Sequence, residues 1–197
     1  WLIIMKTKKN FIYNLKEYAI KNDVPIINDE GLEFLLELIK THNVKTILEI
    51  GTAIGYSAIN MAHLDTKIIT VERDYFMYEQ AINNIKESNL EENIKVIYAE
   101  ALELEITEKF DLIFIDAAKA QYQKFFEKFK INLNENGIIV CDNLNFHNLN
   151  INEVSRGTRQ LLKKIERFKE FLENNDEFAT TIYNVGDGIS VSKRRMK

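Results

Sequence analysis

The chain has 197 residues, of which 46% are hydrophobic, and this suits one compact α/β domain with a sizeable core rather than two full domains. The net charge of −4 argues against a general nucleic-acid binder, and no apolar run approaches the roughly 20 residues that a membrane span needs. Cys141 is the single cysteine, which excludes an internal disulfide, and we expect a soluble, cytoplasmic protein.

Apolar periodicity predicts helices first and then an alternation of strands and helices. Residues 10–21 and 29–40 have helical spacing, and we expect residues 1–44 to form a helical segment that packs on the core. The alternation that follows is typical of a doubly wound parallel sheet, which assigns residues 45–197 to the main domain. Its predicted strands lie at 45–50, 67–72, 94–98, 110–115 and 138–141, and its predicted helices at 56–63, 75–88 and 121–131.

The end of the chain departs from this alternation. A long amphipathic helix is predicted at about 158–173, followed by strands at 178–184 and 189–192 that are joined by Val185-Gly-Asp-Gly188. Strands this close together pair as an antiparallel hairpin, because a parallel pair needs a long crossover. We therefore expect an α/β, Rossmann-like, doubly wound sheet of seven strands that is mostly parallel and ends in an antiparallel hairpin.

A glycine-rich turn follows the first predicted strand. Gly51 and Gly55 are spaced as G-x-x-x-G, so the G-x-G-x-x-G fingerprint of dinucleotide binding is not met. A carboxylate near the strand end, Glu49, can bind a cation such as an amino-acid ammonium. Glu72 ends the next strand, 21 positions after Gly51, where an acid can accept hydrogen bonds from ribose hydroxyls. The turn and the acid together indicate a nucleoside-bearing ligand without a pyrophosphate, although a turn of this kind can also be only a tight connection.

Oxygen-bearing side chains follow two other apolar strands. Asp116 comes directly after one strand, and Asp142 and Asn143 come after the next. The carboxyl ends of parallel strands are where ligands bind, and these hard oxygen ligands favour magnesium, calcium or manganese over zinc. No cluster of Cys and His offers a zinc site, and His147 is the one histidine near the predicted site. The alternatives are a helix N-cap for Asp116 and an Asx turn for Asp142-Asn143.

Lys119 stands three residues after Asp116. A neighbouring divalent cation favours the neutral form of a lysine, which would make Lys119 available as a base. Without a cation, a solvated lysine in the first turn of a helix is the simpler interpretation.

The segment Glu49–Gly55 together with Glu72 resembles the class I methyltransferases that depend on S-adenosyl-L-methionine. That resemblance implies that Glu49, Gly51 and Ser57 hold the methionine part, that Glu72 holds the ribose, and that residues 99–101 flank the adenine. The cofactor-binding residues implied are Ile27, Glu49, Gly51, Thr52, Gly55, Ser57, Glu72, Glu100, Ala101 and Asp116.

The pattern Asp-x-x-Lys followed by Asp-Asn resembles the metal-dependent O-methyltransferases of the catechol and caffeoyl-coenzyme A type. Within that group the likeness is strongest to the bacterial tRNA 5-hydroxyuridine methyltransferases. It is carried by residues 50–58, 115–123 and 185–193. The resemblance implies that Asp116, Asp142 and Asn143 bind Mg²⁺, that Lys119 and Asp116 are catalytic, and that the protein is a homodimer.

Three functions are compatible with the sequence. The first is methylation of 5-hydroxyuridine to 5-methoxyuridine at the wobble position, with the tRNA anticodon loop as partner. The second is methylation of a small catechol-like molecule, and the third is non-catalytic binding of S-adenosylmethionine or RNA. Residues 156–197 hold ten Lys or Arg against six Asp or Glu, which is either a solvated helix face or a surface for phosphates. The candidate phosphate-contacting residues are Arg156, Arg159, Lys163, Lys164, Lys193, Arg194 and Arg195.

Overall fold

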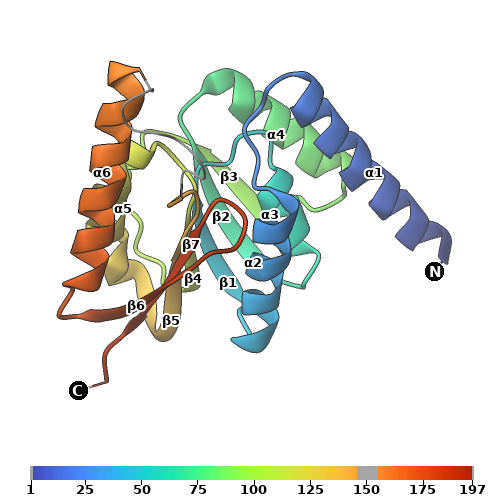
Figure 1. The fold of residues 1–197 in the computed structure, drawn as a ribbon. Helices are drawn as coiled ribbons and strands as arrows, with labels where there is room; N and C mark the ends of the chain where they lie inside the picture. Colours follow the sequence, from blue (N-terminus) through green and yellow to red (C-terminus); the bar gives the residue numbers. More distant parts are fainter. Residues whose placement is uncertain (1, 146–154, 197) are drawn as a thin grey trace.

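The computed structural model describes residues 2–145 and 155–196, with side chains from residue 9 onward. A central sheet is covered by helices on both faces, with α5 and α6 on one side and α1 to α4 on the other (Figure 1). The strand order is β3-β2-β1-β4-β5-β7-β6, which confirms the predicted seven-stranded sheet. The strands are β1 (Thr46–Ile50), β2 (Lys67–Glu72), β3 (Ile94–Tyr98), β4 (Phe110–Ile115), β5 (Leu133–Cys141), β6 (Phe178–Tyr183) and β7 (Ile189–Arg194).

The helices begin where the sequence offers side chains that cap them. The side chains of Asn28, Asp74 and Ser155 accept hydrogen bonds from backbone N–H groups in the first turns of α2, α4 and α6. The helices are α1 (Leu2–Lys21), α2 (Asp29–Thr41), α3 (Tyr56–Ala62), α4 (Tyr75–Glu87), α5 (Tyr122–Phe129) and α6 (Arg156–Glu173), with the 3₁₀ turns η1 (Lys119–Gln121) and η2 (Lys130–Asn132). Among the described residues, no helix is both long and apolar enough to cross a membrane.

The central strands are apolar on both faces because each face is covered. In β4, Leu112 and Phe114 pack toward α2 and α3, while Ile113 and Ile115 pack toward α5 and α6. Successive side chains of a strand point to opposite faces, so a continuous apolar run fills both halves of the core.

The strand register brings the predicted site residues to one edge. β1, β4 and β5 are parallel neighbours, with Ile50 opposite Ile115 and Ile115 opposite Cys141. The next residues along the chain, Gly51, Asp116 and Asp142, therefore leave the sheet side by side. The antiparallel strand β7 returns to this edge, where its turn lies beside the residues after β5, and the backbone N–H of Leu144 donates to Gly188 O at 2.9 Å.

Several predicted boundaries were wrong. The first helix begins at Leu2 rather than at residue 10, since nothing in residues 2–9 stops a helix. The fifth strand begins at Leu133 rather than at residue 138, and its register with β4 shifts between Phe110 and Leu112. This irregular, polar start to β5 lacks the apolar alternation that identifies a strand in a sequence.

The helix predicted at 121–131 is also shorter than expected. The region instead forms the α-helix α5, with the 3₁₀ turn η1 directly before it and the 3₁₀ turn η2 directly after it. Only the middle part, Tyr122–Phe129, carries the buried aromatic face that packs on the sheet.

Candidate active site

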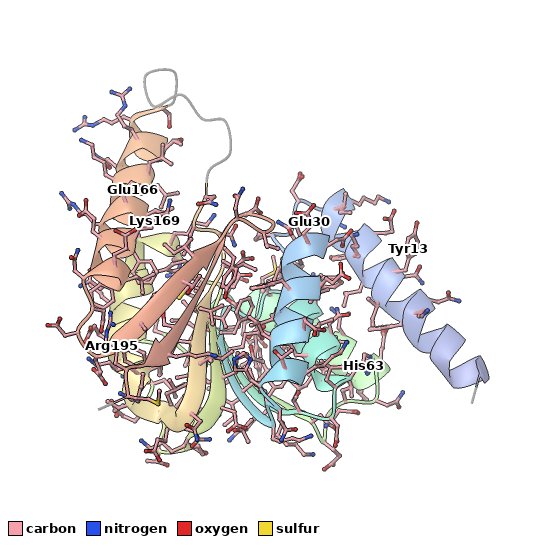
Figure 2. All side chains as sticks on the ribbon, turned by 60° about the horizontal axis from the view of Figure 1, so that its bottom comes forward. Tyr13, Glu30, His63, Glu166, Lys169 and Arg195 are labelled. Carbon is pink, nitrogen blue, oxygen red and sulfur yellow. The ribbon has the colours of Figure 1, made fainter. Side chains whose placement is uncertain are left out.

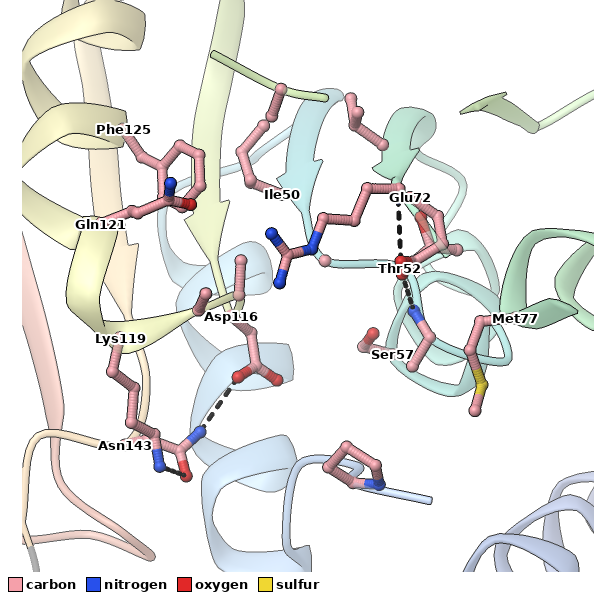
Figure 3. A pocket seen from close by; sticks show the side chains of 18 of the residues that line it. Ile50, Thr52, Ser57, Glu72, Met77, Asp116, Lys119, Gln121, Phe125 and Asn143 are labelled. Atoms are coloured by element: carbon pink, nitrogen blue, oxygen red, sulfur yellow. Dashed lines mark hydrogen bonds between the residues drawn. The ribbon is translucent and has the colours of Figure 1, made fainter. Parts of the chain in front are cut away.

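A cavity of about 320 Å³ opens at the carboxyl edge of β1, β2 and β4 (Figure 3). Its walls come from the glycine turn, from the residues that follow β2, β3 and β4, and from the connection between α1 and α2. Of the predicted cofactor residues, the following line it: Ile27, Gly51, Thr52, Ser57, Glu72, Glu100, Ala101 and Asp116. Lys119 and Asn143 line it as well, so the predicted cofactor site and the predicted cation site share one cavity.

The glycine turn brings backbone rather than side chains to the cavity wall. Gly51 has φ +103°, and a Cβ atom there would lie 2.1 Å from the carbonyl oxygen of Asp116. Any side chain at this position would therefore push apart the ends of β1 and β4. Gly55, at φ +86°, precedes α3 and is not part of the cavity lining.

Glu72 is held by backbone groups on both sides. Its Oε2 accepts a hydrogen bond from the N–H of Ala53 at 2.8 Å, and its Oε1 accepts from the N–H groups of Arg73 and Asp74 at 2.9 and 2.8 Å. The carboxylate thus joins the glycine turn to the start of α4 before any ligand binds. Glu72 also lines the cavity, so the structure orients an acceptor at this part of its wall.

Glu49 lies behind the cavity wall rather than on it. The side chain is fully buried, and its two oxygens accept hydrogen bonds from Ser57 Oγ and Thr70 Oγ1, both at 2.5 Å. Burial raises the pKa of Glu49 to about 8, and the charges of Asp116 and Glu72 act in the same direction. Glu49 is not among the residues that line the cavity, but it accepts a hydrogen bond from Ser57, which does line it.

Asn143 connects the ends of β4 and β5. Its Nδ2 donates to Asp116 Oδ1 at 3.0 Å, and its Oδ1 accepts from Lys119 Nζ at 3.2 Å (Figure 3). Its backbone has φ +64°, in the left-handed region that Asn tolerates better than most residues. A carboxylate, an amide and an ammonium therefore converge at one end of the cavity.

Asp142 supplies a second carboxylate beside this group, with one oxygen unpaired. Oδ1 accepts from the backbone N–H of Asn143 at 2.7 Å, whereas Oδ2 is buried and has no hydrogen-bond partner. Burial and the charge of Asp116 raise the pKa of Asp142 to about 7. Burial also raises the pKa of Asp116 to about 6, although the nearby Lys119 lowers it.

These residues fit a hard divalent cation. Asp142 is buried with one unpartnered oxygen and Asp116 is partly buried beside it, so the two carboxylates, each with a raised pKa, would be stabilised by more positive charge than Lys119 alone supplies. Within residues 2–145 and 155–196, no three His, Cys, Asp or Glu side chains are grouped to hold a metal, so a cation here depends on the amide oxygen of Asn143 as well. The N-cap alternative for Asp116 is not observed, because Ala118 precedes η1 and makes no side-chain cap. His147 lies outside the described residues.

The basic residues predicted to contact phosphates fall into two groups. Arg156, Arg159 and Lys163 lie on α6, which packs against η1 and α5 on the side of the cation site. Lys193 pairs with Ile138, several residues before the ligand end of β5, and Arg194 and Arg195 lie further still from that end. Figure 2 shows Arg195 near the end of α6 that follows Lys169, away from the first turn of that helix. Lys164 also lies on α6, so the seven residues do not form one surface.

Other residues of the cavity were missed from the sequence. Arg73 lines it and forms an ion pair with Glu100 at 3.7 Å, and Tyr56, Met77 and Phe125 line it too. The position of Arg73 directly after the predicted ribose acid was a usable signal. Tyr56, Met77 and Phe125 look like ordinary core residues in the sequence, and only the fold shows that they face a cavity.

A parallel sheet with an antiparallel last hairpin, a glycine turn and an acid at the end of β2 define the class of Rossmann-like methyltransferases that use S-adenosylmethionine. The chain belongs to the O-methyltransferase family, whose family model matches residues 4–195. It is an S-adenosylmethionine-dependent O-methyltransferase of the caffeoyl-coenzyme A and catechol type.

Individual relatives agree with this assignment. The caffeoyl-CoA O-methyltransferase of Populus kitakamiensis is 28% identical over 193 residues, covering 91% of this chain and 82% of that protein. A solved structure from Staphylococcus aureus, described as a candidate caffeoyl-CoA O-methyltransferase, is 38% identical with a TM-score of 0.89 and covers 93% of this chain and 92% of that one. An O-methyltransferase from Bacillus cereus, solved in complex with SAH (S-adenosylhomocysteine), is 25% identical with a TM-score of 0.79, covering 94% and 91%.

Proposed function

We propose that this protein transfers a methyl group from S-adenosylmethionine to one oxygen of a vicinal oxygen pair on a small, catechol-like acceptor, with Mg²⁺ or another hard divalent cation at Asp116, Asp142 and Asn143. The observation that carries the proposal is the meeting of Lys119, Asn143 and Asp116 at one end of the cavity. A methyl donor held by the glycine turn and Glu72 would occupy the other end.

Each residue has a distinct part in this reaction. Glu72 and the backbone at Gly51 bind and orient the donor, so that transfer becomes a reaction between two positioned groups. As the neutral amine that a neighbouring divalent cation would favour, Lys119 accepts the proton of the acceptor hydroxyl on Nζ and becomes the ammonium, while its hydrogen bond to Asn143 keeps Nζ near the site. A bound cation would supply charge stabilisation for the acceptor oxygen and lower its pKa.

A small acceptor is supported by the relatives and by the chemistry of the site. The Populus relative is a caffeoyl-CoA O-methyltransferase, and a caffeoyl group carries two hydroxyls on neighbouring ring carbons. Two neighbouring oxygens match a site that combines hard oxygen ligands with a lysine base. The same requirement excludes acceptors with a single isolated hydroxyl.

A second candidate acceptor is 5-hydroxyuridine at the tRNA wobble position. Its ring carbonyl and hydroxyl oxygens are also vicinal, so the same site would suit it. The observation that favours it is that α6 contacts η1, the turn that carries Lys119, and that its exposed face carries Arg156, Arg159, Lys163, Lys164 and Arg167. The alternative is that these basic side chains are only solvated, as on any surface helix.

Methylation assays separate the two acceptors. Purified protein with S-adenosylmethionine and Mg²⁺ is offered caffeic acid and catechol in one arm, and 5-hydroxyuridine-containing tRNA in the other, with products identified by mass spectrometry. Methylation of the catechols that is lost with EDTA and restored with Mg²⁺ is the expected result. Methylation of tRNA but not of the catechols would favour 5-hydroxyuridine as the acceptor. No turnover in either arm would contradict both proposed acceptors.

The homodimer implied by the family resemblance is also part of this proposal. Light scattering coupled to size-exclusion chromatography measures it directly. A mass close to 23.1 kDa at micromolar concentration would show a monomer instead.

A further inference from the structure

Two complementary polar atoms are buried without partners beside the candidate cation site. One is the hydroxyl of Tyr122, a side chain that is 1% exposed, and the other is Oδ2 of Asp142. The first is a hydrogen-bond donor and the second is an acceptor. Buried groups of these types almost always have a partner, because leaving one unpaired costs free energy. Unpaired polar atoms of this kind are unusual in a folded core and typical of a functional site.

The fold holds Tyr122 next to the ends of β4 and β5. It is the first residue of α5, directly after the turn η1 that carries Lys119 to Asn143. Tyr122 packs in one buried cluster with Ile115, Cys141 and Leu144, the residues that precede Asp116 and Asp142 and follow Asn143. Burial raises the pKa of Tyr122 well above its ordinary value, and the charge of Asp116 raises it further. An edge-to-face contact with Phe168 of α6, at 5.6 Å between ring centroids, restricts the ring.

Tyr122 does not line the cavity, so its hydroxyl acts on neighbouring protein groups rather than on bound molecules. Asp142 Oδ2 is the nearby acceptor that has no other donor. Asp142 Oδ1 accepts a hydrogen bond from the backbone N–H of Asn143. Oδ2 is therefore the oxygen that remains to accept a hydrogen bond and to contact a cation.

We infer that Tyr122 is a positioning residue of the cation site, whose hydroxyl donates a hydrogen bond to Asp142 Oδ2 when a divalent cation is bound and so fixes the orientation of that carboxylate. The inference rests on the cation of the proposed function and deepens it. When a cation is bound, the Tyr122 hydroxyl orients the Asp142 carboxylate that contacts it, as groups hydrogen-bonded to metal ligands commonly do.

The Tyr122→Phe variant tests this inference, because it removes the hydroxyl and keeps the ring. Mn²⁺ binding is measured by electron paramagnetic resonance, and melting temperature is measured with and without Mn²⁺. We expect Mn²⁺ affinity to fall about 10- to 100-fold, while the melting temperature without metal is unchanged or higher and the affinity for S-adenosylhomocysteine is unchanged. Tyr98→Phe, an exposed tyrosine at the β3 edge of the sheet, is the matched control.

The outcomes are distinct. Mn²⁺ affinity equal to that of the parent protein would overturn the role of Tyr122, as would a lower melting temperature without metal at unchanged Mn²⁺ affinity, which marks a purely structural hydroxyl. A parent protein that binds no Mn²⁺ would overturn the cation site itself, and this inference with it. Weakened Mn²⁺ binding in Tyr122→Phe but not in Tyr98→Phe supports the inference.

Discussion

Lys119 illustrates how the surroundings of one residue set its chemistry. Its ammonium donates to Asn143 and lies in the field of Asp116, which holds it at the end of the cavity where an acceptor hydroxyl would meet it. In the proposed reaction, the neutral amine of Lys119 takes the proton of the acceptor hydroxyl, and the methyl donor is held by other residues.

We therefore expect Lys119→Met to lower kcat about 10²- to 10⁴-fold, the usual contribution of a general base. Isothermal titration should give the same affinity for S-adenosylhomocysteine as in the parent protein. Lys124→Met, which removes an exposed lysine of α5, serves as the control and should keep full activity. If Lys119→Met kept its turnover, another group would have to remove the proton from the acceptor hydroxyl.

Glu49 gives a second prediction at this scale, through the pH dependence of stability. Its pKa is about 8 in the folded protein and near 4.5 in the unfolded chain, so the unfolded state releases its proton first. The stability that protonated Glu49 contributes is complete below pH 4.5 and is lost as pH rises to 8, by at most about 1.4 kcal/mol per pH unit. Asp116 and Asp142 act in the same direction at lower pH.

Glu49→Gln should remove this loss, because the amide stays neutral and can still bond Ser57 and Thr70. Urea unfolding at pH 5.5 and pH 8 measures it. The variant should gain stability relative to the parent protein at pH 8 and little at pH 5.5. An equal difference at both values would show that ionisation of Glu49 does not limit stability.

At the scale of the elements, α6 presents its basic residues on one side and its apolar residues on the other. Ile165, Phe168 and Leu172 are buried against the sheet layer, whereas the lysines and arginines of its first three turns face outward. Burial requires only the apolar face, so packing of the helix on the core does not account for the outward basic residues.

Changing Arg156, Arg159 and Lys163 together to Glu tests whether that partner is tRNA. If tRNA is the acceptor, filter binding should show at least about a tenfold loss of affinity and a shallower salt dependence. Lys193→Glu, at the other end of the sheet, should leave binding unchanged. Equal tRNA binding by all three proteins, with catechol methylation intact, would leave α6 as a solvated helix.

The elements also show which parts of the fold and site could be predicted from sequence. The strand ends at Asp116 and Asp142 were identifiable because buried strands are continuous apolar runs that stop at a polar residue. The start of β5 was missed because its first residues are polar and out of register. Two features depend on the pairing of distant strands, which a linear pattern does not encode. They are the position of Glu49 relative to the cavity lining and the separation of Lys193 from α6.

At the scale of the whole molecule, the cavity walls are gathered from distant parts of the chain. The link between α1 and α2 contributes Pro25 and Ile27, and the segment after β3 contributes Ala101. A ligand that fills this cavity contacts most of the elements at once and should stabilise them together.

S-adenosylhomocysteine at about 100 times its dissociation constant should add roughly 2.7 kcal/mol, or about 5–10 °C in melting temperature for a domain of this size. Glu72→Ala should lose most of that shift. Asp142→Asn should keep it, because Asp142 is outside the cavity lining. Differential scanning fluorimetry of the three proteins measures this, and a full shift in Glu72→Ala would argue against its role at the ribose.

The position of β7 has a consequence for the order in which the protein is made. β7 is the last strand along the described chain, yet it lies between β5 and β6, so the strand that carries Asp142 has an open edge until β7 pairs with it. During synthesis on the ribosome, this edge is exposed while more than forty further residues are added. An unpaired edge of an apolar strand invites pairing with other chains. The strand that ends at the candidate cation site is therefore also the strand whose exposed edge is covered last during synthesis.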